Sequence, residues 1–174
     1  MKIRTMAAGI AVAAGLTFSG FGYAAAQPGD FGALPVDPNL ITDSLAYSAA
    51  PPVINPNGQP GVETVYTHRD GSRTITTTVL VLPDAQAATG ALDGARAATA
   101  ANGKSQPVAV GSGGTMLTGK SSDGSQSVTL LSFAEGNTAT TIEFAGAAND
   151  PAPEDLVLEL GRKQDTAIRD WQAA

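Results

Sequence analysis

The fold of this chain is decided by residues 62–82, VETVYTHRDGSRTITTTVLVL. Two runs rich in Val, Ile and Thr, residue types that favour strands, flank a central Asp70-Gly71 pair. Asp-Gly supplies the two positive φ angles that a tight hairpin turn requires. With this pair as a two-residue loop, Tyr66 lies opposite Ile75. We therefore predict a β-hairpin with one apolar face and one Thr-rich face, because a slip of one residue would exchange the two faces.

The chain beyond this hairpin predicts a helix and then more strands. Residues 85–101 are mostly Ala, with Asp84 placed to cap a helix and Asn102-Gly103 placed to end it. Strands are expected between Val108 and Ala145, with a loop at 111–114 and a second Asp-Gly hairpin at 122–125.

The register of the last hairpin has two alternatives. A three-residue loop would place Val128 and Leu130 on the face of Ile142 and Phe144, whereas a two-residue Gly136-Asn137 turn would place Leu131 and Phe133 there. In both cases the strand 128–133 carries apolar residues on both sides, which is typical of a strand covered on both faces.

A closing helix is predicted at the C-terminus. Its apolar positions recur at helical spacing: Leu156, Val157, Leu160, Gln164, Ala167, Ile168 and Trp171. Asp150 is expected to cap it, with Pro151 in its first turn. The prediction is one α+β domain over residues 62–174, with a mostly antiparallel sheet sandwiched by helices.

Residues 27–61 form a Pro- and Gly-rich arm before this domain. The spacing of the prolines predicts an extended segment without regular structure, apart from a short helix around Leu40–Ala49. Its apolar residues are too many for a free linker, so we expect the arm to lie against the domain.

Residues 1–26 have the pattern of a secretory signal peptide. Two cations, Lys2 and Arg4, precede an apolar run, and Ala24 and Ala26 predict cleavage between Ala26 and Gln27. The alternative is an uncleaved anchor, although the run of 17 residues is short for a membrane span of about 20. The chain has no Cys, so a lipid anchor on an N-terminal Cys is not expected. We expect a secreted or cell-envelope protein with no stable membrane anchor after cleavage.

Composition excludes several function classes. The chain has 10 Lys and Arg against 16 Asp and Glu, and cleavage of the leader would remove two of the basic residues and none of the acidic ones. Such an acidic chain lacks the positive surface that nucleic-acid binding needs. Without Cys there is no thiol chemistry and no Cys-based metal site. No cofactor motif or dense set of oxygen ligands is present, so no cofactor and no metal are expected.

The candidate reactive residues are few. His68 is the only histidine, and as a general base it would need a nucleophile or a carboxylate beside it. We interpret it as a strand-end residue and predict no catalytic residue. Trp171 and Tyr66 could line a ligand pocket, but core packing is the preferred interpretation. Met116, Leu131 and Phe133 are predicted to form an apolar cluster, either packed under the 85–101 helix or the arm, or open as a binding patch.

The layout resembles a known group of exported proteins. Residues 78–84, TVLVLPD, enter the predicted helix, and residues 122–136 run from SDGS to FAEG. With the leader and the closing helix, this order is similar to the small exported actinobacterial and mycobacterial proteins of the LpqN type. The resemblance spans roughly residues 62–172 and implies a Mog1/PsbP-like fold and a binding role. The lipoprotein members carry an anchor Cys that this chain lacks.

Three functions follow as expectations. The first is an exported, non-enzymatic binding protein whose ligand is a partner protein or an envelope-derived small molecule. The alternative is a hydrolase or accessory enzyme of cell-envelope glycan or lipid metabolism that uses only carboxylates and hydroxyls. A third is a structural envelope protein without a discrete site.

Overall fold

The computed structural model describes residues 30–43, 45–99 and 103–174, so the predicted leader and the predicted helix stop at Asn102 lie outside the described residues. The strands are β1 Tyr47–Ala49, β2 Val53–Ile54, β3 Gly61–His68, β4 Arg73–Val81, β5 Lys104–Pro107, β6 Ser112–Lys120, β7 Gln126–Glu135 and β8 Thr138–Ala147. In the described part of the chain they form one eight-stranded sheet of order β1-β3-β4-β8-β7-β6-β5, with β2 paired to β3.

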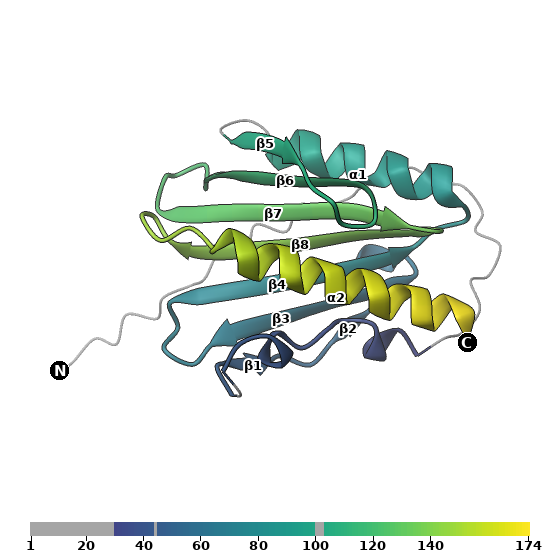
Figure 1. Cartoon of the computed structure of the whole chain (residues 1–174), viewed down its shortest axis with the longest axis horizontal. Helices are drawn as coiled ribbons and strands as arrows, with labels where there is room; N and C mark the ends of the chain where they lie inside the picture. The colour runs from purple at the N-terminus through teal and green to yellow at the C-terminus, as the bar shows by residue number, and fades with distance from the viewer. Residues whose placement is uncertain (1–29, 44, 100–102) are drawn as a thin grey trace.

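Two α-helices complete the α+β fold of the described residues: α1 Ala85–Thr99 and α2 Glu154–Ala173. Figure 1 shows α2 crossing the front of the sheet, while α1 lies behind its upper strands. Three short 3-10 turns occur in the N-terminal arm: η1 Phe31–Ala33, η2 Pro38–Leu40 and η3 Pro56–Gly58.

The first hairpin has the predicted register. Tyr66 pairs with Ile75 across β3 and β4, and Gly71 has φ of 73° in the turn. Val62, Tyr66, Ile75 and Val79 all lie in the core beneath α2. The hydrophobic pattern therefore predicted the register correctly. The turn itself differs from the prediction, because residues 69–72 join the two strands and only Gly71, not Asp70, has a positive φ.

The last hairpin adopts the shorter of the two predicted loops. Glu135 pairs with Thr138 and Leu131 with Ile142, so Gly136-Asn137 is a two-residue turn with Gly136 at φ 54°. This register places Leu131, Phe133, Ile142 and Phe144 on the face that α2 covers.

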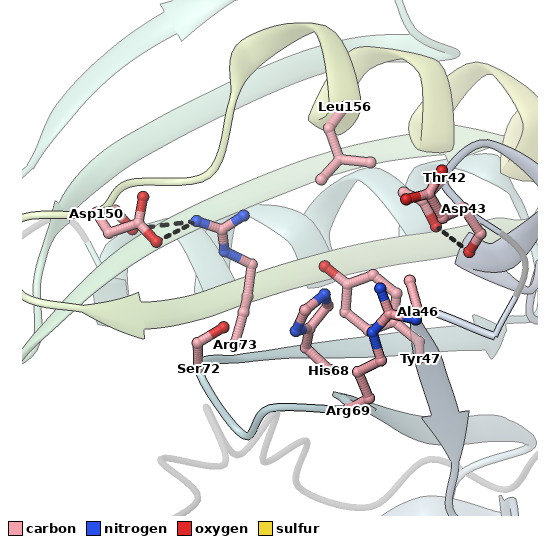
Figure 2. A pocket seen from close by; sticks show the side chains of 10 residues that line it. All are labelled: Thr42, Asp43, Ala46, Tyr47, His68, Arg69, Ser72, Arg73, Asp150 and Leu156. Carbon is pink, nitrogen blue, oxygen red and sulfur yellow. Dashed lines mark hydrogen bonds and ion pairs between the residues drawn. The ribbon is translucent and has the colours of Figure 1, made fainter.

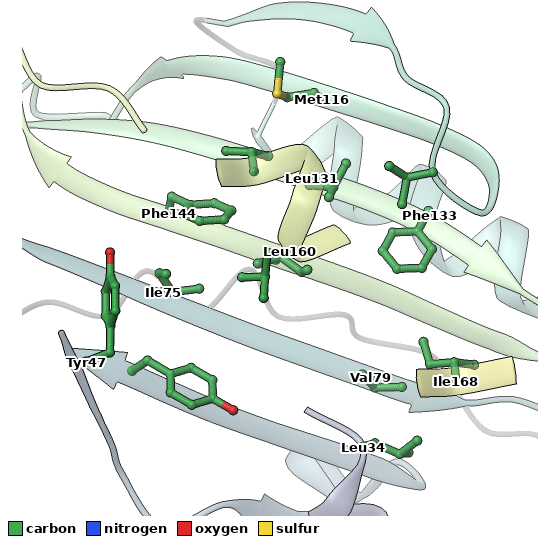
Figure 3. Packing of buried hydrophobic residues seen from close by; sticks show 14 of the residues in the cluster. Leu34, Tyr47, Ile75, Val79, Met116, Leu131, Phe133, Phe144, Leu160 and Ile168 are labelled. Carbon is green, nitrogen blue, oxygen red and sulfur yellow. The ribbon is translucent and has the colours of Figure 1, made fainter. Parts of the chain in front are cut away.

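The two faces of the sheet carry cores of different size. Figure 3 shows the larger one, in which Leu131, Phe133 and Phe144 of the sheet pack under Leu160 and Ile168 of α2. The smaller one joins α1 to the opposite face through Leu80, Leu82, Ala88, Ala91, Leu92, Ala134 and Ala139. Alternate residues of β7 therefore enter both cores, which confirms the prediction that this strand is covered on both faces.

Both predicted helices form, but the cap of the second differs from the prediction. Asp84 caps α1 as expected, since the amide of Ala87 donates to its Oδ1 at 2.8 Å. The cap position of α2 is Pro153, and Asp150 bonds Arg73 instead. The expected cap at Asp150 is wrong because a neighbouring cation, absent from the local sequence, binds its carboxylate.

The N-terminal arm corrects two expectations. No helix covers Leu40–Ala49, because Tyr47–Ala49 is strand β1 and pairs with β3. The arm is also not without regular structure, since β2 pairs with β3 as well. Both strands are short enough to fit between prolines, and each obtains its hydrogen bonds from an edge of the sheet.

Two features of the other half of the sheet were not predicted. Strand β5 is a four-residue edge strand of exposed residues, so it carries no alternating apolar pattern. The segment 111–114, expected as a loop, already pairs in part, since Ser112 lies opposite Ala134 before a β-bulge leads to Thr115. Bulges keep a strand paired although its sequence is rich in glycine.

Candidate functional site

A polar hollow lies at the end of the sheet where β3 turns into β4 (Figure 2). It has a volume of about 270 Å³ and is open to solvent on one side. The arm, the β3–β4 hairpin and the segment leading into α2 each contribute to its wall. The lining residues are Thr42, Asp43, Ala46, Tyr47, His68, Arg69, Ser72, Arg73, Asp150 and Leu156.

Strand pairing brings the central residues of the hollow together. Tyr47 of β1 lies opposite His68 of β3, and their rings meet edge to face with centroids 5.1 Å apart. Thr67 pairs with Thr74, so His68 at the end of β3 faces Arg73 at the start of β4. Three neighbouring strands therefore present an aromatic ring, an imidazole and a guanidinium in one row on the α2 side of the sheet.

His68 is held by the carboxylate of the turn. Its Nδ1 lies 2.5 Å from Oδ1 of Asp70, and because an ionised carboxylate only accepts, Nδ1 carries the proton. Hydrogen bonds from the side chain of Ser72, from His68 and from the amide of Ser72 hold the pKa of Asp70 well below its usual range. The amide of Ser72 donates to Asp70 at 2.8 Å.

These three residues do not form a nucleophilic triad. In such a triad the carboxylate binds Nδ1 of the histidine and the serine hydroxyl binds Nε2, so that the imidazole can take the hydroxyl proton. Here Ser72 and His68 both bond to Asp70. The arrangement stabilises the turn and the orientation of the imidazole, without a hydroxyl activated by it.

Arg73 joins the hollow to the segment before α2. Its Nη2 donates to the Asp150 carboxylate at 2.9 Å and lies 3.3 Å from the Asp150 carbonyl oxygen. The hydroxyl of Ser127 donates to that same carbonyl at 2.8 Å. Gly146 lies opposite Arg73 on β8, and an added Cβ there would be 3.5 Å from Nε of Arg73. The tighter contact of such a Cβ would be with the carbonyl oxygen of Asp150, at 3.1 Å.

The hydroxyl of Tyr47 remains a hydrogen-bond donor. Burial raises the pKa of this phenol, and the adjacent Arg73 guanidinium opposes part of the rise. Figure 2 shows the hydroxyl pointing between Arg73 and Leu156. A neutral phenol can both donate to and accept from a ligand.

The residues proposed as a binding patch lie in the core. Met116, Leu131 and Phe133 are all buried under α2, with Leu131 and Phe133 fully inaccessible (Figure 3). The expectation of an open patch is therefore corrected, and so is packing under the 85–101 helix, since α1 covers the opposite face. Side chains alternate between the two faces along each strand, so Leu131 lies on the same face as Ile142 and Phe144, which is the face that α2 covers.

The two large aromatics also serve the structure. Tyr66 is buried in the core, where burial raises its pKa to about 12. Its hydroxyl lies 3.5 Å from the carbonyl oxygen of Pro35. Trp171 packs on Phe31 with ring centroids 6.0 Å apart. Neither residue lines the hollow.

Sequence reasoning considered His68 but interpreted it as a strand-end residue, and it missed the other residues of the hollow. Tyr47, Asp43 and Thr42 come from the Pro-rich arm, and Asp150 comes from a segment interpreted as a helix cap. The only available signal was the surplus of apolar and aromatic residues in an arm that otherwise reads as a linker. Within the described residues there is no group of three or more His, Cys, Asp or Glu side chains placed to hold a metal ion.

Comparison with known proteins adds little to this description. No protein-family model matches the chain, and no curated protein sequence matches it. Among solved structures, the extracellular domain of PknH from Mycobacterium tuberculosis is similar with a TM-score of 0.43 and 8% identity, over 76% of this chain and 70% of that one. A similarity at this level establishes neither a shared fold nor a shared activity. No helix in the described ranges is long and apolar enough to cross a membrane.

Proposed function

We propose that this chain is an exported, non-enzymatic binding protein of the cell envelope or secretome, and that the hollow holds a small, neutral molecule rich in hydroxyl groups. The observation that carries the proposal is the balanced charge of the lining. Two guanidinium groups, of Arg69 and Arg73, stand against two carboxylates, of Asp43 and Asp150. A ligand with a strong net charge would meet attraction and repulsion in the same small space.

The hydrogen-bonding groups of the hollow match a polyhydroxy compound. Arg69 offers donors and Asp43 offers acceptors, and neither side chain has an ion pair among the residues that the structure describes. The hydroxyl of Tyr47 can donate and accept, and the hydroxyl of Thr42, which donates to the carbonyl of Pro38 at 3.0 Å, can accept. Sugar hydroxyls also donate and accept, and ring C–H groups can pack on the partly exposed ring of His68. An envelope-derived sugar or polyol therefore suits this site.

Binding without turnover is supported by the connectivity around Asp70. Nucleophilic catalysis needs a hydroxyl placed on a base, and Ser72 bonds to the carboxylate rather than to His68. The hydrolase alternative would need a different arrangement of these groups. The kinship with LpqN-type proteins and the Mog1/PsbP-like fold are also proposals, supported by the order of elements and by a mostly antiparallel sheet with helices on both faces.

The test is ligand-observed NMR with a panel of neutral sugars (glucose, maltose, N-acetylglucosamine) and two anions that carry C–H protons, acetate and methyl phosphate. We expect saturation transfer to at least one neutral sugar and none to the anions. Tyr47→Phe and Arg69→Ala should each weaken sugar binding about 2–10-fold, which is the effect of one hydrogen bond. Arg162→Ala, at an exposed site on α2, is the matched control and should leave binding unchanged.

Two results would overturn the proposal. Equal losses in Arg69→Ala and Arg162→Ala would show that the hollow is not the site. Hydrolysis of p-nitrophenyl acetate by the chain, lost in His68→Ala, would favour the enzyme instead.

A further inference from the structure

A buried carboxylate with an unpartnered oxygen lies on the buried side of α2 itself, far along the helix from the hollow. Asp165 is 8% exposed, and its Oδ1 has no hydrogen-bond partner. Its other oxygen, Oδ2, lies 2.8 Å from Nη2 of Arg169, one turn later on the same helix. Leaving a buried carboxylate oxygen without a donor is costly, so this atom requires an explanation.

A second carboxylate shares the same guanidinium nitrogen. Oε2 of Glu135, at the end of β7, lies 3.3 Å from Nη2 of Arg169. Glu135 is itself only partly exposed, whereas Arg169 is largely in solvent. One cation therefore stands between two carboxylates, and a net negative charge is left at the junction of α2 with β7.

No other described side chain supplies the missing positive charge. The charged groups that act on Asp165 are Arg169 on its own helix and Glu135 on β7. On the adjoining segment, the backbone amide of Gly111 hydrogen-bonds to the Asp165 carboxylate and lowers its pKa. Desolvation raises the pKa of Asp165, Arg169 opposes the rise, and the charge of Glu135 and a hydrogen bond with it raise the pKa further.

We propose that the Asp165 carboxyl keeps its proton and donates it in a hydrogen bond to Glu135, with which it shares Nη2 of Arg169, and that this makes the contact of α2 with β7 a pH-sensitive device. With the proton in place, the buried Asp165 carboxyl donates to Glu135 instead of repelling it. When the proton leaves to solvent, two carboxylates face each other around one guanidinium, and the second half of α2 is held less tightly. The contact is therefore strongest in acid and weakens as the pH rises.

The direction of the effect follows from linkage. A group whose pKa is raised in the folded state stabilises the fold below its unfolded pKa, and this contribution is lost as the pH rises through the folded value. Asp165 belongs to this class. Replacing it with an isosteric amide should remove the pH dependence, because Asn can donate to Glu135 at every pH.

The experiment compares thermal unfolding of the full chain and of Asp165→Asn between pH 4 and pH 8. We expect Asp165→Asn to raise the Tm by about 2–4 °C at pH 8, which corresponds to roughly 1 kcal/mol. The difference should vanish at pH 4. Asp170→Asn, at an exposed acid on the same helix, is the matched control and should follow the unchanged chain throughout.

A second measurement decides the matter if the amide variant does not fold. Carboxyl ¹³C shifts of the unchanged chain should show that Asp165 stays protonated above the usual range of an Asp. Glu135→Gln should return Asp165 to a lower pKa. Titration of Asp165 at the ordinary value of an Asp, or identical pH profiles for Asp165→Asn and Asp170→Asn, would overturn the proposal.

Discussion

The side-chain amide of Gln164 forms hydrogen bonds with the backbone of the N-terminal arm at Val36. Its Oε1 accepts from the amide of Val36 at 2.9 Å, and its Nε2 donates to the carbonyl of Leu34 at 2.8 Å. Gln164 is completely buried, on the apolar stripe of α2. A side-chain amide therefore supplies the hydrogen bonds that a strand would supply, and it fixes the arm to the helix.

Gln164→Leu should lower the free energy of unfolding by about 2 kcal/mol, because it leaves two buried backbone groups of the arm without partners. Urea unfolding measures this change. Lys163→Ala, the exposed neighbour on the same helix, is the control and should change stability little. A Gln164→Leu chain as stable as the unchanged protein would mean that the arm does not depend on this contact.

Gly161 and Gly90 form a matched pair of helical glycines. A Cβ at Gly161 would lie 2.3 Å from Cδ2 of Leu131 and 3.2 Å from Val110, whereas a Cβ at Gly90 meets nothing within 4 Å. Gly161→Ala should destabilise the fold by about 1–2 kcal/mol, because the clash outweighs the gain in helix propensity. Gly90→Ala should stabilise it by up to about 1 kcal/mol. Denaturant midpoints compare the two, and stabilisation by both would show that α2 is not closely packed on β7.

Arg73→Ala should release the segment that leads into α2. Arg73 is mostly buried and binds both the carboxylate and the carbonyl of Asp150. We expect a loss of about 1–2 kcal/mol in stability, together with faster amide exchange in residues 148–153. Hydrogen-exchange mass spectrometry reads the second effect directly. Arg162→Ala provides the baseline, and exchange confined to other segments would contradict the assignment.

Ser72→Ala should raise the pKa of Asp70 toward that of an ordinary Asp. The side-chain hydrogen bond from Ser72 is the largest cause of the lowered value, ahead of the one from His68. Because the folded pKa is depressed, the stabilising contribution of Asp70 is present above the unfolded pKa and is lost as the pH falls through the folded value. Carboxyl ¹³C titration measures the change. Ser125→Ala, the equivalent position in the β6–β7 turn, should leave Asp70 unaffected.

Local sequence patterns predicted the structure correctly wherever it depends on residues that are close together in the chain. The Asp70-Gly71 turn and the alternation around it predict the register of β3 with β4, and the stripe from Leu156 to Trp171 predicts the buried face of α2. The choice between two registers for the last hairpin needed the tertiary structure. Both loops suit the local sequence, and only burial of Leu131 and Phe133 against Leu160 and Ile168 selects the shorter one.

The sequence by itself determined the hairpins, the two helices and the acidic, Cys-free composition, because these follow from backbone preferences and periodicity within short windows. Tertiary structure alone decided the arm and the hollow. Strands β1 and β2 exist because β3 offers an edge to pair with, and the hollow joins Asp43, His68 and Asp150, which lie far apart in the chain. Contacts over such separations depend on the packing of the whole sheet, and no local pattern records them.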